Sequence, residues 1–341
     1  VFTTPNVFPP EDFQQHDVDV TDFRDVLEEQ HCYVCKVKYR QVHHFYDQLC
    51  PDCAEFNFAK RTETADLSGR VALLTGGRVK VRDSTLRYSQ EADFEDWGHR
   101  LEIYGLDLRH TPSVEQFCRH LMTAHDRLDD IINNACQTVR RPPEFYRHMM
   151  ELETGSLREL PSEAAALLGG VDGLRGYDLL DPGTAAGDSL ESIVPDGPAA
   201  AELSQLPLLP DDSRHAGHLF PGGHLDQDLQ QVDLREQNSW RLTLAEVSSV
   251  EMLETQLVNA VAPFVLNARL KPLMLRSPER DKHIVNVSAV EGQFYRRFKT
   301  TKHPHTNMAK AALNMMTRTC ATEYAQDGIH MNSVDTGWVS D

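Results

Sequence analysis

The sequence lacks the long apolar runs and the basic excess that two large classes of protein require. No stretch approaches the roughly 18 apolar residues needed to cross a bilayer, and no signal-peptide pattern opens the sequence. The formal net charge of −18 argues against broad binding to nucleic acid or anionic membrane, because neutralising phosphates needs clustered Lys and Arg. We therefore expect a protein of the cytoplasm or another reducing intracellular compartment, without a membrane segment or a nucleic-acid partner.

Cysteine is also scarce, with seven residues, but four of them form one cluster. An odd number and a tight cluster favour a metal site in a reducing compartment over a disulfide framework. Two Cys-x-x-Cys pairs, Cys32/Cys35 and Cys50/Cys53, are separated by 14 residues and can converge on one tetrahedral ion. Thiolates at about 2.3 Å suit zinc, and a closed four-sulfur shell leaves no position for substrate. The spacing predicts structural zinc, with iron or a redox pair as alternatives.

The cysteines define a predicted zinc module, residues 26–62, which follows an extended arm, residues 1–25. A module this short cannot bury a sufficient core alone, so its folding should depend on the ion. His43 and His44 are alternative ligands, although with four cysteines we expect them to pack or to face solvent. Aromatic residues are expected to dock the module onto the larger domain: Phe45, Tyr46, Phe56 and Phe58.

A buried strand, a loop and a helix follow one another late in the chain. Residues 284–287 are a short β-branched apolar run, typical of a strand buried on both faces. Residues 288–292 leave its carboxyl end, where open α/β sheets bind ligands. Over residues 307–319 apolar side chains recur at helical spacing: Met308, Ala312, Met315 and Met316.

With residues 67–77 (LSGRVALLTGG) and 131–135 (IINNA), this stretch resembles the short-chain dehydrogenase/reductase family. The resemblance spans residues 67–150 and 227–341. It implies an α/β fold, a Rossmann-like doubly wound parallel sheet, combined here with a small N-terminal zinc-binding module and a long irregular insertion. It also implies an NAD(P)-dependent oxidoreductase, and a homodimer that pairs through the helices of Asn259 and Lys310.

The insertion is placed at residues 151–226 of a Rossmann domain that runs from residue 63 to 341. Its content of Ala, Leu, Gly, Pro and Asp has little sustained period, which favours an irregular lid or a strap that binds a protein partner. Residues 163–168 predict one short helix within it. Beyond the insertion, Ser248 opens a predicted long helix that contains Asn259.

The resemblance is weaker for catalysis than for fold. Lys310 matches the family's catalytic lysine, and Asn259 matches its proton-relay asparagine. The serine position holds Ala289, however, and the tyrosine position holds Thr306. A threonine hydroxyl cannot readily give or take a proton near neutral pH. The leading hypothesis is therefore a nucleotide-binding or scaffold pseudoenzyme.

Other side chains near Lys310 offer replacements for the missing relay. Tyr295, His303 and His305 lie between the strand and this lysine, and histidine titrates near neutral pH. One alternative is thus an active NAD(P)H-dependent reductase with one of these groups as acid. Another is a structural subunit of a larger complex that acts through the zinc module and the insertion. The basic strip at residues 296–302 is either a solvated loop or a contact to an anionic cofactor.

The cofactor cradle of the family is only partly retained. Thr75 and Gly76 match its glycine-rich loop, whereas the next two glycine positions hold Lys80 and Arg82. Lys80 could compensate by charge, although its side chain obstructs close approach of the backbone. By resemblance, the residues expected beside a cofactor are Thr75, Gly76, Gly77, Lys80, Asp107, Asn133, Asn134, Ala135, Lys310 and Gly337.

The interval after Gly77 is too short for the family's topology. A crossover helix, a second strand and a second helix must precede a third strand at residues 101–107, and one crossover alone takes about a dozen residues. Only one helix, at residues 82–98, is predicted there. We predict that roughly 20 residues are missing near Val81–Arg82, because a βαβ unit needs them. A genuine deletion would remove much of the cradle.

Overall fold

The computed structural model describes residues 24–76, 80–155, 160–168, 200–213, 217–224, 231–294 and 299–337. The chain divides into two compact units. The small unit comprises residues 1–69 and 226–229, and the larger unit comprises residues 70–225 and 230–341. Most of the predicted arm, residues 1–23, lies outside the described residues, and residues 24 and 25 belong to the first strand.

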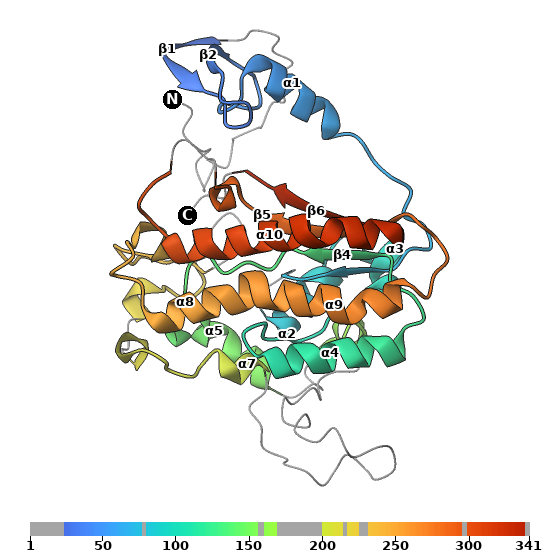
Figure 1. Cartoon of the computed structure of the whole chain (residues 1–341). Helices are drawn as coiled ribbons and strands as arrows, with labels where there is room; N and C mark the ends of the chain where they lie inside the picture. Colours follow the sequence, from blue (N-terminus) through green and yellow to red (C-terminus); the bar gives the residue numbers. More distant parts are fainter. Residues whose placement is uncertain are drawn as a thin grey trace, which may run out of the picture. The chain divides into compact units, whose positions relative to one another are not determined.

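The small unit consists of a hairpin and a helix (Figure 1). Strand β1 (Arg24–His31) pairs antiparallel with β2 (Lys38–Val42), and α1 (Pro51–Lys60) begins with proline at its first position, where no backbone N–H is needed. Its core is small: Cys32, Tyr39, Val42, Leu49, Cys50 and Ala54. A core of six residues agrees with a module that needs a further cross-link.

The larger unit is built on a four-stranded parallel sheet in the order β3-β4-β5-β6. The strands are β3 (Ala72–Leu74), β4 (Asp130–Asn133), β5 (Lys282–Ser288) and β6 (Ile329–Asp335). The α/β class and the strands predicted around residues 131–135 and 284–287 are confirmed. Short β-branched runs become strands here because a parallel sheet buries them between neighbours.

Long helices cover one face of this sheet. They are α4 (Thr111–Ala124), α8 (Ser249–Gln256), its continuation through a π-helical turn η6 (Leu257–Val261) into α9 (Ala262–Met274), and α10 (Pro304–Gln326). Figure 1 shows α9 between α10 and α4. One core joins them to the strands: Ile131, Ile284 and Met331 from the sheet pack with Leu266 and Leu270 from α9.

The opposite face of the sheet is partly open. Leu74, Ile132, Val285 and Asn332 lie in register across the four strands. Leu74 is 53% exposed, Asn332 is exposed, and the two residues between them are half-buried. Parallel sheets normally carry helices on both faces. A helix formed by the residues predicted to be missing near Val81–Arg82 could cover this face; the missing segment itself stays a prediction.

The interval after β3 contains α2 (Val81–Ser89), α3 (Phe94–Trp97) and the 3₁₀ turn η1 (Gly98–Arg100). The single helix predicted at residues 82–98 is thus divided into three parts. The strand predicted at residues 101–107 is wrong, because only Ile103 forms a bridge, with Leu168. No second strand in the described part of the chain lies beside it to complete a ladder.

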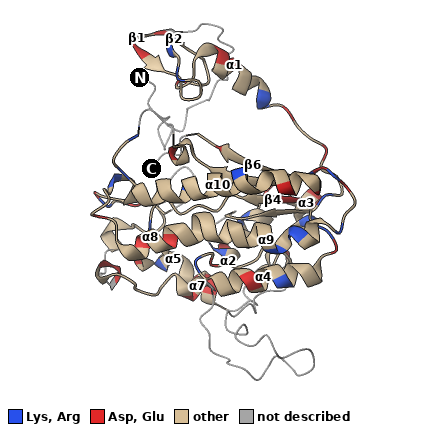
Figure 2. Cartoon of the chain, viewed as in Figure 1, with Lys and Arg blue, Asp and Glu red and all other residues tan. Residues whose placement is uncertain are grey.

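The described parts of the insertion consist of short helices. They are α5 (Pro143–Thr154), which leads into it, α6 (Ser162–Ala166), α7 (Ala200–Leu203), η3 (Pro210–Ser213) and η4 (Gly217–Leu219). The helix predicted at residues 163–168 is confirmed as α6. Among the described residues, no helix combines the length and apolar character that a bilayer span requires. Figure 2 shows that acidic and basic residues are interspersed along the helices of the larger unit.

Candidate functional site: a cysteine cluster and a family site with altered residues

The four predicted cysteine ligands converge in the small unit. The sulfur atoms of Cys32, Cys35, Cys50 and Cys53 all lie within 4.8 Å of one another. A tetrahedral zinc ion with Zn–S bonds of about 2.3 Å separates its sulfurs by about 3.8 Å. Cys35 and Cys50, whose sulfurs are 3.5 Å apart, approach that spacing. The donor set therefore fits a four-thiolate zinc site.

Local backbone geometry aims these thiols inward. Residues 32–36 form a tight turn, which the Lys36 N–H closes by donating to the Cys32 carbonyl. Lys36 has a φ of +65°. Cys50 stands immediately before α1, and Cys53 lies in its first turn. Burial and then the neighbouring Cys50 thiol raise the pKa of Cys53. A divalent cation would reverse this effect, because it stabilises the thiolates.

The two histidines of the module are not part of the sulfur cluster. His43 is buried, and its Nδ1 accepts the backbone N–H groups of Phe45 and Tyr46 at 3.1 and 3.2 Å. Its Nε2 is 3.6 Å from the Glu55 carboxylate. The ring of His44 meets Phe58 edge-on at 4.8 Å. Both residues pack, as expected.

In the larger unit, two of the residues predicted to match the family's catalytic positions, Thr306 and Lys310, lie in the first turns of α10, and Ala289 follows β5. The Lys310 ammonium is buried and donates to the Val287 carbonyl at 2.8 Å. Ala289 has no polar side-chain atom. The Thr306 side chain is only 4% exposed, and its Oγ1 has no hydrogen-bond partner. Of these three residues, only Lys310 carries a side chain that ionises readily.

The two histidines before Lys310 face other elements. His303 begins α10 with φ +41°, and its ring meets Trp240 edge-on at 4.8 Å. Burial lowers the pKa of His303. His305 is 2% exposed, and its Nε2 is 3.6 Å from a Glu251 carboxylate oxygen. Tyr295 and residues 296–298 of the basic strip lie outside the described residues.

Asn259 lies in the π-helical turn that joins α8 to α9. Its side-chain amide clamps the backbone of Gln137, accepting the N–H at 3.0 Å and donating to the carbonyl at 2.8 Å. Inserted π-helical turns are often found at functional sites. In this chain the amide is fully engaged in holding the segment that follows β4.

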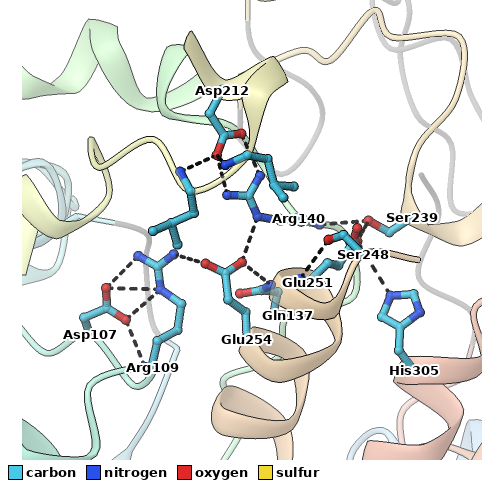
Figure 3. Close-up of polar contacts among 12 residues, drawn as sticks. Asp107, Arg109, Gln137, Arg140, Asp212, Ser239, Ser248, Glu251, Glu254 and His305 are labelled. Atoms are coloured by element: carbon cyan, nitrogen blue, oxygen red, sulfur yellow. Dashed lines mark hydrogen bonds and ion pairs between the residues drawn. The ribbon is translucent and has the colours of Figure 1, made fainter. Parts of the chain in front are cut away.

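A charged network on α8 extends this contact to the insertion (Figure 3). Glu254 accepts from Arg109 at 2.7 Å and from Arg140 at 2.9 Å, and Arg140 makes a bidentate pair with Asp212, both bonds 2.7 Å long. Asp107, expected to meet an adenine ring, instead receives the Arg109 guanidinium. These pairs are largely buried and therefore tie the insertion to the core.

The residues predicted to begin the cofactor cradle, Thr75 and Gly76, contact the segment that follows β4. Gly76 has φ +75°, and a Cβ built on it would lie 2.6 Å from the Ala135 Cα. The Thr75 hydroxyl accepts the Ala135 N–H at 3.1 Å, and Asn134 donates to the Gly76 carbonyl at 3.3 Å. The structure thus brings four of the predicted cofactor residues together. Gly77 lies outside the described residues, and Gly337, at φ +86°, donates to Asp335 after β6.

The second half of the cradle is engaged by the insertion, which the sequence did not predict. The buried Lys80 ammonium donates to the Ser204 hydroxyl at 2.5 Å and to the Ala201 carbonyl at 3.3 Å. Glu153 of α5 accepts the backbone N–H groups that begin α2, from Arg82 and Asp83. The Glu153 carboxylate thus satisfies two backbone N–H groups at the N-terminus of α2.

A buried asparagine cluster supports the sheet beneath the site. The Asn133 amide donates to the Asn267 oxygen at 2.9 Å and to the Asn286 oxygen at 2.8 Å. Asn286 in turn donates to the Thr317 hydroxyl at 2.9 Å. Asn133 was expected beside a cofactor, but its amide nitrogen is directed into the core. In the sequence, the only indication that Asn286 has a special role is that it is a polar residue between Val285 and Val287.

Comparison with known proteins gives matches over different parts of the chain. A family model described as Enoyl-(Acyl carrier protein) reductase matches residues 237–341. An uncharacterized protein of Acanthamoeba polyphaga mimivirus is 25% identical over 342 residues, which cover 91% of this chain. The chain spans 64% of the length of that curated relative.

Two solved structures are similar at lower identity. A metagenomic short-chain oxidoreductase in complex with NADP is 15% identical, with 81% of this chain and 84% of that chain covered and a TM-score of 0.39. A short-chain dehydrogenase from Streptomyces avermitilis is 13% identical, with 79% and 65% covered and a TM-score of 0.40.

Proposed function

We propose that the chain is a member of the short-chain dehydrogenase/reductase family, and that it is a catalytically silent one that works through binding and assembly. One observation carries the proposal. The positions of the family's Ser–Tyr relay hold Ala289, which has no proton to transfer, and Thr306, whose hydroxyl is buried without a partner. An acid–base catalyst must reach the reacting atom and titrate near the working pH, and neither residue does so.

The retained residues of the site have structural tasks that support this proposal. Lys310 is bonded to the Val287 carbonyl and Asn259 to the Gln137 backbone. His305 is a poor replacement acid, because its ring is buried beside Glu251 in the helix layer. His303 packs on Trp240, and burial lowers its pKa, which disfavours the protonated form needed in an acid.

The cysteine cluster would hold one structural zinc ion in this proposal. Four sulfurs fill the tetrahedral shell, so the ion would supply a cross-link and no open coordination position. None of the seven cysteines, all of which are described, forms a disulfide in the structure, which agrees with the proposed reducing compartment. Exposed aromatic rings on the module, Phe45 at 49% and Phe56 at 63%, favour a protein partner for this surface.

A homodimer is part of the same proposal. Large apolar side chains remain exposed along the helices that family members use for pairing: Leu253, Phe264, Met308 and Met315. A second copy of the chain would remove them from water. We expect sedimentation at the mass of a dimer, and at the mass of a monomer after Phe264→Glu with Met315→Glu.

A turnover assay on the zinc-loaded full chain tests the proposed lack of catalytic activity. NADH or NADPH is mixed with a panel of aldehydes, ketones and enoyl thioesters, and cofactor oxidation is followed by absorbance. We expect the wild-type rate to equal that of Lys310→Met, within the background. A wild-type rate that Lys310→Met abolishes would refute the proposal. A rate lost on His305→Ala or His303→Ala would favour an active reductase instead.

A further inference from the structure

Two histidines lie side by side on the open face of the parallel sheet. His283 of β5 and His330 of β6 are partners in register, so their side chains leave the sheet on the same face. Both stand near the amino-terminal ends of their strands, opposite the carboxyl ends where open α/β sheets bind ligands. Their ring centres are 5.4 Å apart. Two imidazoles on one zinc ion, with Zn–N bonds of about 2.1 Å, have ring centres about 5 Å apart. The spacing of the pair is therefore that of two ligands of a single ion.

Asp281, immediately before β5, brings a carboxylate to this pair. Its Oδ1 is 3.0 Å from Nε2 of His283. Two ligand atoms that share one ion at about 2.1 Å each lie about 3.0 to 3.4 Å apart. The other carboxylate oxygen, Oδ2, accepts from Arg70 at 2.7 Å. Arg70 thus orients the carboxylate and leaves Oδ1 on the side of the imidazole, as outer partners of metal ligands do.

A second carboxylate on the neighbouring strand adds negative charge beside the histidines. Asp130 of β4 is in register with His283 and is 9% exposed. Its Oδ2 has no hydrogen-bond partner in the described part of the chain, whereas the adjacent Asp129 is paired with Arg127 at 2.8 Å. Burial raises the pKa of Asp130, because the charged form is poorly solvated there. A bound cation would stabilise that charged form, so the arrangement favours a cation at this place on the sheet.

We propose that His283, His330 and Asp281 form a second metal site, for a divalent cation of the zinc type, in the larger unit. Imidazole nitrogen and carboxylate oxygen are both ligands of zinc. Three protein ligands leave a coordination position open to water, unlike the closed shell of the four cysteines. Among the described residues, only the cysteine sulfurs gather three or more ligand atoms within 4.8 Å of one another. Binding therefore requires His330 to turn toward the other two ligands, which its exposed side chain permits.

The test adds Zn²⁺ to the zinc-loaded full chain, prepared without a polyhistidine tag. Calorimetric titration and metal analysis should show one further zinc ion in the wild type. His283→Ala and His330→Ala should each weaken its binding at least tenfold. His99→Ala, which removes an exposed histidine from another part of the larger unit, is the matched control and should bind as wild type does. His330→Gln serves if an alanine variant does not fold.

The charge of Asp130 is tested in the same titration. Asp130→Asn removes the charge but none of the three ligands, and should weaken zinc binding about threefold through the lost attraction. A variant that binds zinc more tightly than the wild type would refute this electrostatic role.

Wild-type protein that takes up no zinc beyond the cysteine cluster would overturn the inference. Equal losses in His99→Ala and His330→Ala would overturn it as well, because the uptake would then belong to surface histidines in general. The outcome is independent of the proposed function. Oxidation of NADPH by the wild type refutes the proposed lack of catalytic activity and leaves the second site untouched, whereas a missing second zinc ion refutes only that site.

Discussion

The cysteine cluster of the small unit and the start of α10 in the larger unit differ in what their residues can still do. All four thiols lie within 4.8 Å of one another, so the donor set for a metal is complete. At the start of α10, Lys310 donates to the Val287 carbonyl and the Thr306 hydroxyl is buried without a partner among the described residues, while Ala289, after β5, has no polar side-chain atom. The comparison shows that a complete set of metal-ligating side chains is assembled in the small unit, whereas the side chains compared in the larger unit include only one that ionises readily.

The largest expected effect is loss of the metal site. Cys50→Ser should leave one zinc ligand missing and unfold the small unit, because structural zinc contributes about 10–16 kcal/mol to folding in comparable modules. Strands β3 to β6 should remain protected. The measurement is metal content by mass spectrometry with hydrogen exchange of both units. Cys136→Ser, which changes an exposed cysteine outside the cluster, is the control. A Cys50→Ser chain with one tightly bound zinc and an intact small unit would contradict the assignment.

The next effect concerns the retained half of the cradle. Gly76→Ala places a Cβ 2.6 Å from the Ala135 Cα at φ +75°, and should cost about 3 kcal/mol from positive φ and overpacking together. Gly223→Ala has almost the same φ, +78°, with no atom within 4 Å, and should cost about 1 kcal/mol. Urea unfolding measures both. Equal costs would mean that the close approach of Thr75–Gly76 to Ala135 is absent in solution.

A pH effect follows from the altered half of the cradle. Burial lowers the pKa of Lys80 to about 8. The folded state therefore binds fewer protons than the unfolded state between this value and the ordinary lysine pKa, so stability is penalised below about pH 8 and recovers above it. Relative to Lys80→Met, wild-type stability should rise by about 2 kcal/mol from about pH 8 to about pH 10. Lys302→Met, at an exposed position, is the control. If the stability difference between wild type and Lys80→Met does not change with pH, the Lys80 ammonium is exposed to solvent rather than buried.

Local sequence was sufficient where one segment alone determines the structure. The runs at residues 131–135 and 284–287 became strands, Ser248 caps α8 by accepting the Glu251 N–H, and the cysteine spacing brought four thiols together. The sequence of residues 101–107 predicts a strand, but a strand must pair with a neighbouring strand. In the structure only Ile103 pairs, through an isolated bridge to Leu168.

Contacts between distant segments could not be predicted. Glu153 and Arg82 are 71 positions apart, and the pairing of Arg140 with Asp212 spans 72. Neither residue of such a pair has a local period or motif that signals its partner. The replacement of glycine by Lys80 and Arg82 was visible in the sequence, whereas the groups that receive these cations were not.

The smallest expected effect tests the central claim about Thr306. Its hydroxyl is buried without a partner, so Thr306→Val should change stability by less than about 1 kcal/mol, or raise it, because an unpaired polar group is replaced by a methyl of similar shape. Thr85→Val is the matched control: that hydroxyl is also buried but donates to the Arg82 carbonyl at 2.8 Å, and its loss should cost about 1–2 kcal/mol. If Thr306→Val proves the costlier of the two in urea unfolding, the hydroxyl has a partner in solution. The difference between the complete cysteine cluster and the residues around Lys310 would then be smaller than these contacts indicate.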